Sequence, residues 1–187
     1  MSTALSPRTN RGPAAAADNR RALIAAAREV YAEGGLSAPF SAVAKRAGVG
    51  QGSLYRHFPD RTALAVAVFE ENVADLEVFT ATGERTIDDL MDRVVDQAVS
   101  STAFIELITA DMNDPRVQPL GERFGAVVAA LVARERAAGR LGEHIDAADV
   151  NMAVGMLATE LARADAASRP AVARRARALF HAAFAPR

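Results

Sequence analysis

Apolar residues recur every three or four positions along the chain, which is the spacing of α-helices with one buried face. The first such run places Leu23, Ala26, Ala27, Val30 and Tyr31 on one side of a helix. Glycine, proline and capping residues interrupt the pattern, and no stretch alternates apolar and polar residues as a half-buried strand does. The pattern therefore predicts an all-α fold of about nine helices, over residues 18–33, 41–47, 51–58, 61–79, 87–100, 102–112, 117–138, 146–164 and 170–185.

The composition supports this fold and argues against several function classes. Of 187 residues, 43 are alanine, the best helix former, and ten are aromatic. Cysteine is absent, which excludes disulfides, thiolate metal sites and cysteine nucleophiles, and the three histidines lie far apart in the sequence. Because no nucleophile elbow, phosphate loop or zinc motif is found, the sequence predicts no enzyme, metal site or cofactor. We also expect a cytoplasmic protein that does not enter a membrane, since no signal peptide or apolar run of ~20 residues is seen.

Charge is distributed unevenly along the chain. Residues 1–62 hold nine Lys or Arg and four Asp or Glu, a net +5, whereas residues 63–187 hold thirteen and nineteen, a net −6. A basic N-terminal part suggests that this part contacts an anion such as DNA, although chance variation in composition explains the difference equally well.

Two short predicted helices, 41–47 and 51–58, are joined by a glycine-containing turn and suggest a helix-turn-helix. Gly48 supplies the bend, and Leu54 and Phe58 provide a buried face for the second helix. Its other face is then free to enter the major groove of DNA. That face carries Gln51, Gly52, Ser53, Tyr55, Arg56 and His57.

The stretch AGVGQGSLYRHFPDRTAL, residues 47–64, resembles the A-G-V-S-x-G-x-L-Y-x-H-F-x-x-K-x-x-L signature of the tetracycline-repressor-like (TetR) regulators. AAAREVYAEGGL (25–36) and SAVAKRAGV (41–49) are similar to the family as well. Pro39-Phe40 departs from the family, which usually has a capping threonine there. Arg61 replaces a lysine and keeps a cation for the DNA backbone. The resemblance implies a repressor that a small, largely apolar ligand releases from a pseudo-palindromic operator.

The resemblance also implies roles for single residues. Residues 51–53 and Arg56 would lie near the bases, and Tyr55 and His57 at phosphates. The alternatives are a core aromatic for Tyr55, a helix-orienting hydrogen bond for His57 and solvated charges for the cations of helix 41–47. The residues expected to contact DNA are Ser41, Lys45, Gln51, Gly52, Ser53, Tyr55, Arg56, His57 and Arg61.

Residues 1–17 mix proline, serine, glycine and arginine without an apolar period, so we expect a flexible arm there. For the rest of the chain, the resemblance implies a DNA-binding domain (18–62) and a ligand-binding and dimerisation domain (63–187). The last two helices carry apolar stripes that need a partner, either a second copy of the chain or the chain's own core. The expected homodimer interface comprises Val150, Val154, Leu157, Leu161, Val172, Leu179, Phe180 and Phe184. The expected pocket for the unidentified ligand comprises Phe79, Met91, Phe104, Ile108, Met112, Phe124, Val128, Met152 and Met156.

Overall fold

The computed structural model describes residues 13–82, 84–110 and 114–186, without the side chains of 13, 99–102, 104 and 106–110. Within these ranges the chain is all-α, as predicted, with eight α-helices and one short 3-10 helix. The helices are α1 (Pro13–Gly34), η1 (Gly35–Ser37), α2 (Phe40–Ala47), α3 (Gln51–His57), α4 (Arg61–Ala81), α5 (Ile87–Ala110), α6 (Gln118–Ala137), α7 (Ala147–Arg163) and α8 (Arg169–Phe184).

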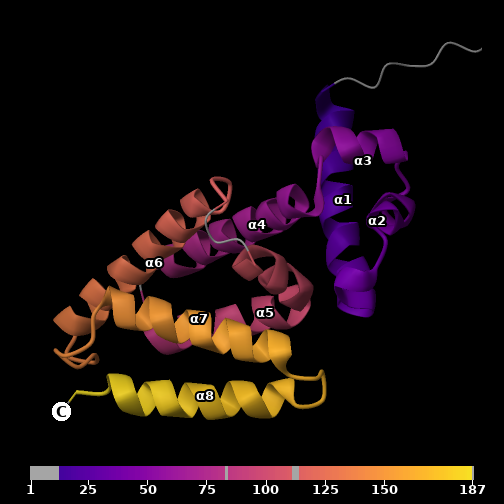
Figure 1. Ribbon diagram of the computed structural model, residues 1–187. Helices are drawn as coiled ribbons and strands as arrows, with labels where there is room; N and C mark the ends of the chain where they lie inside the picture. Colours follow the sequence, from indigo (N-terminus) through magenta and orange to yellow (C-terminus); the bar gives the residue numbers. More distant parts are fainter. Residues whose placement is uncertain (1–12, 83, 111–113, 187) are drawn as a thin grey trace, which may run out of the picture.

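The helices form two groups that α4 connects (Figure 1). Helices α1 to α3 lie together at one end, and α4 leads from them to the bundle of α5 to α8. Helix α5 packs against α1, α4, α6, α7 and α8, and α7 runs alongside α8. In the described ranges, no helix combines the length and apolar character needed to cross a membrane.

Each group has its own apolar core, and α4 contributes to both. The N-terminal core contains Leu23, Leu54, Phe58 and Val68, whereas Leu76 near the other end of α4 belongs to the core of the bundle. Phe69 is partly buried and packs against both cores. A displacement of α4 therefore changes the packing of both groups of helices.

Most helix ends follow signals that are readable in the sequence. Asp146 caps α7 by accepting bonds from backbone N–H groups, and Asp149 returns a bond to the Asp146 backbone in a capping box. Thr86 and Asp89 form the same reciprocal arrangement before α5. Gly48 ends α2 in the left-handed conformation (φ 68°), which costs glycine little.

Two predicted boundaries were wrong. Residues 87–110 form one continuous helix, α5, where the sequence predicted a break near Ser100. Serine and threonine are weak helix formers but do not terminate a helix as proline does, and packing of α5 against five neighbouring helices maintains it. Helix α1 begins at Pro13 rather than near Asp18, since proline fits the first helical position and alanines follow. The rest of the predicted arm, residues 1–12, lies outside the described residues.

Candidate nucleic-acid interface and internal cavity

Helices α2 and α3 form a helix-turn-helix whose turn is residues 48–50. The backbone N–H of Val49 donates to the Ala44 carbonyl at 3.0 Å, which closes the end of α2. Gly50 then enters α3 in an extended conformation. Leu54 and Phe58 are fully buried against α1 and α4, so one side of α3 is fixed to the N-terminal core.

The opposite side of α3, here called the α3 face, carries the six residues expected from the sequence. These residues are exposed or half-buried, and Arg56 carries the one formal charge among them. In the preceding helix Lys45 is exposed and Ser41 half-buried. An uncovered cationic and polar helix face is suited to phosphate oxygens and base edges. The α3 face consists of Gln51, Gly52, Ser53, Tyr55, Arg56 and His57.

Pro39 and Phe40, which depart from the family pattern, affect how α2 meets α3. Pro39 precedes α2 in an extended conformation and supplies no side-chain cap. The Phe40 ring instead contacts the Tyr55 ring edge-on, with centroids 5.5 Å apart and an interplanar angle of 76°. Tyr55 is 51% exposed, so the alternative of a core aromatic does not hold. The contact orients Tyr55 while about half of the residue remains exposed.

Arg61 does not lie as the resemblance implied. Its guanidinium donates to the carbonyls of Leu36 and Ala38, the latter at 2.8 Å, and lies 5.8 Å from the Tyr31 ring centroid. Burial raises the pKa of Tyr31, and the Arg61 charge partly opposes this shift. Arg61 therefore ties α4 to the connection between α1 and α2. No sequence signal could reveal this role, because its partners are backbone carbonyls.

The substitution Arg61→Lys should separate this structural role from a phosphate contact. Lysine keeps the charge but cannot reach both carbonyls with a planar fork. We expect the free energy of unfolding in urea to fall by about 1–2 kcal/mol, with an unchanged salt slope for DNA binding. Arg56→Lys on the exposed face is the control and should leave stability unchanged. A stable Arg61→Lys protein with weakened DNA binding would contradict the structural role.

Arg46, next to Lys45, is also held within the protein. It bonds Glu29 and Glu33 of α1, each at 2.8 Å. The hydrogen bond and charge of Arg46 lower the pKa of Glu33. Arg46 is thus neither a simple solvated charge nor a free DNA contact.

A partly open cavity of about 210 Å³ lies between α4, α5, α6 and α7. Among the described residues, two of its lining side chains are polar, Asn72 and Gln97. The other lining residues are Phe69, Val73, Leu76, Val94, Ala98, Ile105, Val117, Leu120, Gly121, Phe124, Val154 and Ala158.

Most of the predicted pocket residues lie elsewhere. Phe124 lines the cavity, whereas Met91 and Val128 are buried in the surrounding core without reaching it. Phe79 lies beneath Arg85, whose guanidinium carbon is 4.4 Å from the ring centroid. The side chains of Phe104 and Ile108, and the whole of Met112, lie outside the described residues. The actual lining was missed because helical periodicity shows which residues share a face, but not which faces leave a space.

Met152 and Met156 were also placed wrongly, since they are 61% and 58% exposed. In contrast, the predicted interface residues of α7 are buried in the core of the same chain. On α8, Leu179 is 63% exposed, whereas Val172, Phe180 and Phe184 pack partly against that core. The predicted interface residues of α7 are thus buried within the chain, and the two predicted pocket residues of α7 lie on its exposed side. The buried α7 residues are Val150, Val154, Leu157 and Leu161.

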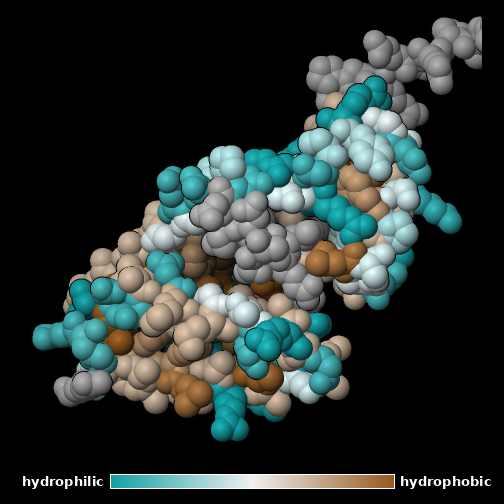
Figure 2. Space-filling model, viewed as in Figure 1, coloured by the Kyte–Doolittle hydropathy of each residue, from teal (hydrophilic) through white to brown (hydrophobic). Residues whose placement is uncertain are grey.

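The outer surface of α7 and α8 carries several exposed apolar residues. Apolar residues gather over these helices, while the surface of α1 to α3 is largely hydrophilic (Figure 2). Gly155 has open space around the position of a Cβ atom, so another helix can approach it closely. We call this surface the α7–α8 face, and its exposed residues include Met152, Gly155, Met156, Leu179 and Ala182.

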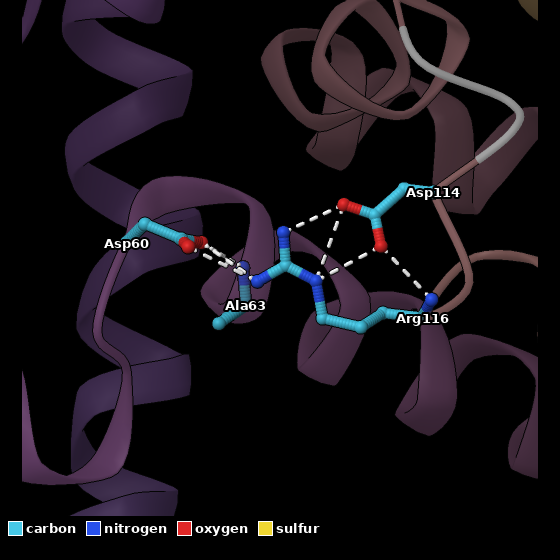
Figure 3. A network of polar contacts seen from close by, with 4 residues as sticks. All are labelled: Asp60, Ala63, Asp114 and Arg116. Carbon is cyan, nitrogen blue, oxygen red and sulfur yellow. Dashed lines mark hydrogen bonds and ion pairs between the residues drawn. The ribbon is translucent and has the colours of Figure 1, made fainter.

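A polar bridge joins the start of α4 to the segment before α6 (Figure 3). Arg116 donates to both carboxylate oxygens of Asp60, at 3.0 and 3.1 Å, and to Asp114 at 2.6–3.2 Å. Asp60 also caps α4 by accepting from the Ala63 backbone N–H at 2.7 Å. This backbone bond, with Arg116, lowers the pKa of Asp60, and the Arg116 hydrogen bond lowers that of Asp114 to about 2. The bridge is therefore fully charged at neutral pH.

Comparisons with known proteins agree with this geometry. Residues 23–68, which contain α2, α3 and the α3 face, match the family described as bacterial regulatory proteins, tetR family. The structure of the TetR transcriptional regulator SCO0520 from Streptomyces coelicolor is 27% identical, with a TM-score of 0.66. That match covers 89% of this chain and 98% of that chain. The N-terminal part of the chain therefore matches the tetR family, and the whole chain has the fold of a TetR regulator.

More distant TetR structures share the fold. A TetR regulator from Mycobacterium vanbaalenii is 22% identical, with a TM-score of 0.60 over 92% of this chain and 98% of that one. GusR from Salmonella enterica is 21% identical, with a TM-score of 0.59 over 89% and 95%. None of the curated proteins matches the chain. The match to the tetR family and the similarity to SCO0520 support a DNA-binding transcriptional regulator.

Proposed function

We propose that this TetR-family regulator is a repressor that binds a pseudo-palindromic operator as a homodimer. A small, largely apolar ligand in the cavity releases it from the operator. In this proposal, residues 18–62 are the DNA-binding domain and the α3 face reads the operator. Residues 63–187 bind the ligand and form the dimer.

The observation that carries this proposal is the course of α4. It begins directly after α3 and supplies four residues of the cavity wall, including Phe69 and Leu76. Its 21 residues span ~31 Å at 1.5 Å per residue, which is enough to connect the two sites. Phe69 packs against both cores, so a ligand that displaces it also shifts the N-terminal core. Release requires that the ligand bind this shifted state better than the DNA-bound state.

The Arg116 bridge offers a second connection. Val117, the residue after Arg116, is buried and lines the cavity. A ligand that moves Val117 also moves the guanidinium that holds Asp60 at the start of α4. The bridge is exposed, so we expect it to adjust the position of the N-terminal core rather than to stabilise the fold strongly.

A double-mutant cycle with Asp60→Asn and Arg116→Gln should show this link. Asparagine still caps α4, so the cycle isolates the bridge. We expect the two changes to be non-additive in operator affinity, by about two- to fivefold. The control is the pair Glu77 and Arg123, which joins α4 to α6 without contacting Asp60. Glu77→Gln and Arg123→Gln should combine additively, and additivity in both cycles would remove the bridge from the release mechanism.

The α7–α8 face supports the homodimer. An apolar, uncovered face on two adjacent helices can meet a second copy of itself about a two-fold axis. Two copies of α3 are then related by the same axis, which requires an operator with two related half-sites.

Selection of bound fragments from genomic DNA tests the proposed function. Enriched fragments should share a pseudo-palindrome, and binding should weaken steeply with added salt. Transcription from the enriched promoter should fall when the protein is supplied, whereas an activator would raise it. Binding without an enriched sequence would contradict the operator proposal.

A further inference from the structure

The size and lining of the cavity restrict the ligand that it can hold. Its volume is about 210 Å³, somewhat larger than the ~150 Å³ apolar cavities that bind benzene. The space therefore accommodates one ring with a small substituent.

One corner of the cavity is polar, and its amide groups are held in place. Asn72 is only 6% exposed, and its side-chain oxygen accepts a hydrogen bond from Arg28 at 2.9 Å. The side-chain amide of Gln97 donates to the main-chain carbonyl of Asn72 at 3.1 Å and to the Asp75 carboxylate at 3.0 Å. Because the Arg28 bond uses the amide oxygen of Asn72, its amide N–H groups can donate to an acceptor in the cavity.

The charges behind this corner disfavour an anionic ligand. Asn72 and Gln97 also border a polar cleft whose charged side chains are three acids and two arginines. Arg93 bonds Asp75 through two nitrogens, each at 2.8 Å, and this pairing lowers the pKa of Asp75. Arg28 also contacts Glu71. The arginines are thus already paired, and an unpaired charge in the apolar cavity would be costly.

We infer that the cavity selects a small neutral molecule of about one ring, whose single hydrogen-bonding group meets the Asn72 amide. The inference rests on the proposed ligand-binding function and names the chemistry of its ligand. The inference also gives the Asn72 amide a regulatory role. The same amide accepts a hydrogen bond from Arg28, which belongs to α1 of the N-terminal group. A ligand bonded to the Asn72 amide is therefore connected to α1 through the Arg28 side chain.

Three probes of similar shape test the selection: toluene, p-cresol and p-toluate. Calorimetric titration of the full-length protein without DNA should give p-cresol binding at least fivefold tighter than toluene. No binding of p-toluate is expected at neutral pH. Equal affinities for toluene and p-cresol, preferred binding of p-toluate, or no binding of any probe would overturn the inference.

Two variants place the binding in the cavity. Asn72→Leu removes the amide at similar volume, and it should abolish the advantage of p-cresol while toluene still binds. Ala98→Leu fills the cavity and should abolish binding of both probes. The wild-type series provides the test if Asn72→Leu does not fold. Retained p-cresol binding in Ala98→Leu would place the site elsewhere and overturn the inference.

Failure of this inference can be told apart from failure of the proposed function. If p-cresol binds as expected but leaves operator affinity unchanged, the selectivity stands and it is release by cavity ligands that fails. If a charged or much larger molecule releases the operator through the cavity, the proposed function stands and the inference is wrong.

Discussion

The double variant Met156→Glu/Leu179→Glu is expected to be a monomer of 19.7 kDa that has lost most of its operator affinity. Met156 and Leu179 lie on the α7–α8 face, where they are 58% and 63% exposed. Around a two-fold axis each new carboxylate would lie close to its symmetry mate or be buried without a partner. Sedimentation at micromolar concentration measures the oligomeric state.

Loss of the dimer should also weaken DNA binding, since one α3 then contacts one half-site only. Losing the second, linked contact typically lowers affinity by about 10²–10⁴-fold. Val78→Glu is the matched control, because Val78 is an apolar residue of α4 that is 71% exposed and lies outside the α7–α8 face. The control should remain dimeric with unchanged affinity. A double variant that sediments as a dimer would show that the interface is elsewhere.

The second large effect is expected from Arg56→Ala on the α3 face. A bidentate arginine contact to guanine is worth roughly 1–3 kcal/mol of discrimination, and a homodimer makes it in both half-sites. Competitive binding to operators changed at single base pairs should therefore show lower affinity and relaxed preference at one position in each half-site.

Two neighbouring cations serve as controls for Arg56. Arg46→Ala should change DNA binding little, because Arg46 is held by Glu29 and Glu33. Lys45→Ala should weaken binding to all sequences alike and lower the salt slope by about one, as expected for a phosphate contact. An Arg56→Ala protein with unchanged sequence preference would mean that the α3 face has been assigned wrongly.

The helices and the helix-turn-helix could be predicted because their signals are local. Gly48 and the Asp146–Asp149 capping box act within a few residues, so the sequence alone shows where these helices end. Periodicity also identified the buried side of α3 through Leu54 and Phe58.

Features that depend on tertiary packing were predicted less well. The spacing of Val150, Leu157 and Leu161 shows that they share a face of α7, but not that the chain's own core covers it. The exposed methionines on the other side were mistaken for pocket residues for the same reason.

One missed residue did have a signal in the sequence. Asn72 lies four residues after Val68 and four before Leu76, so it is a polar residue within an otherwise apolar stripe of α4. Such a position is typical of a buried, hydrogen-bonded amide. Its partner Arg28, 44 residues away, becomes evident only in the folded chain.

In the proposed complex, two α3 faces contact one operator. Because the chain has no cysteine, Gln51→Cys supplies a single attachment point for a DNA-cleaving iron chelate. We expect cleavage at two sites related by a two-fold axis and about 10–10.5 base pairs apart, or a multiple of this spacing. A chelate attached through Glu122→Cys, on an exposed residue of α6, should not cut. Cleavage from Glu122→Cys but not from Gln51→Cys would show that the α3 face does not contact the operator.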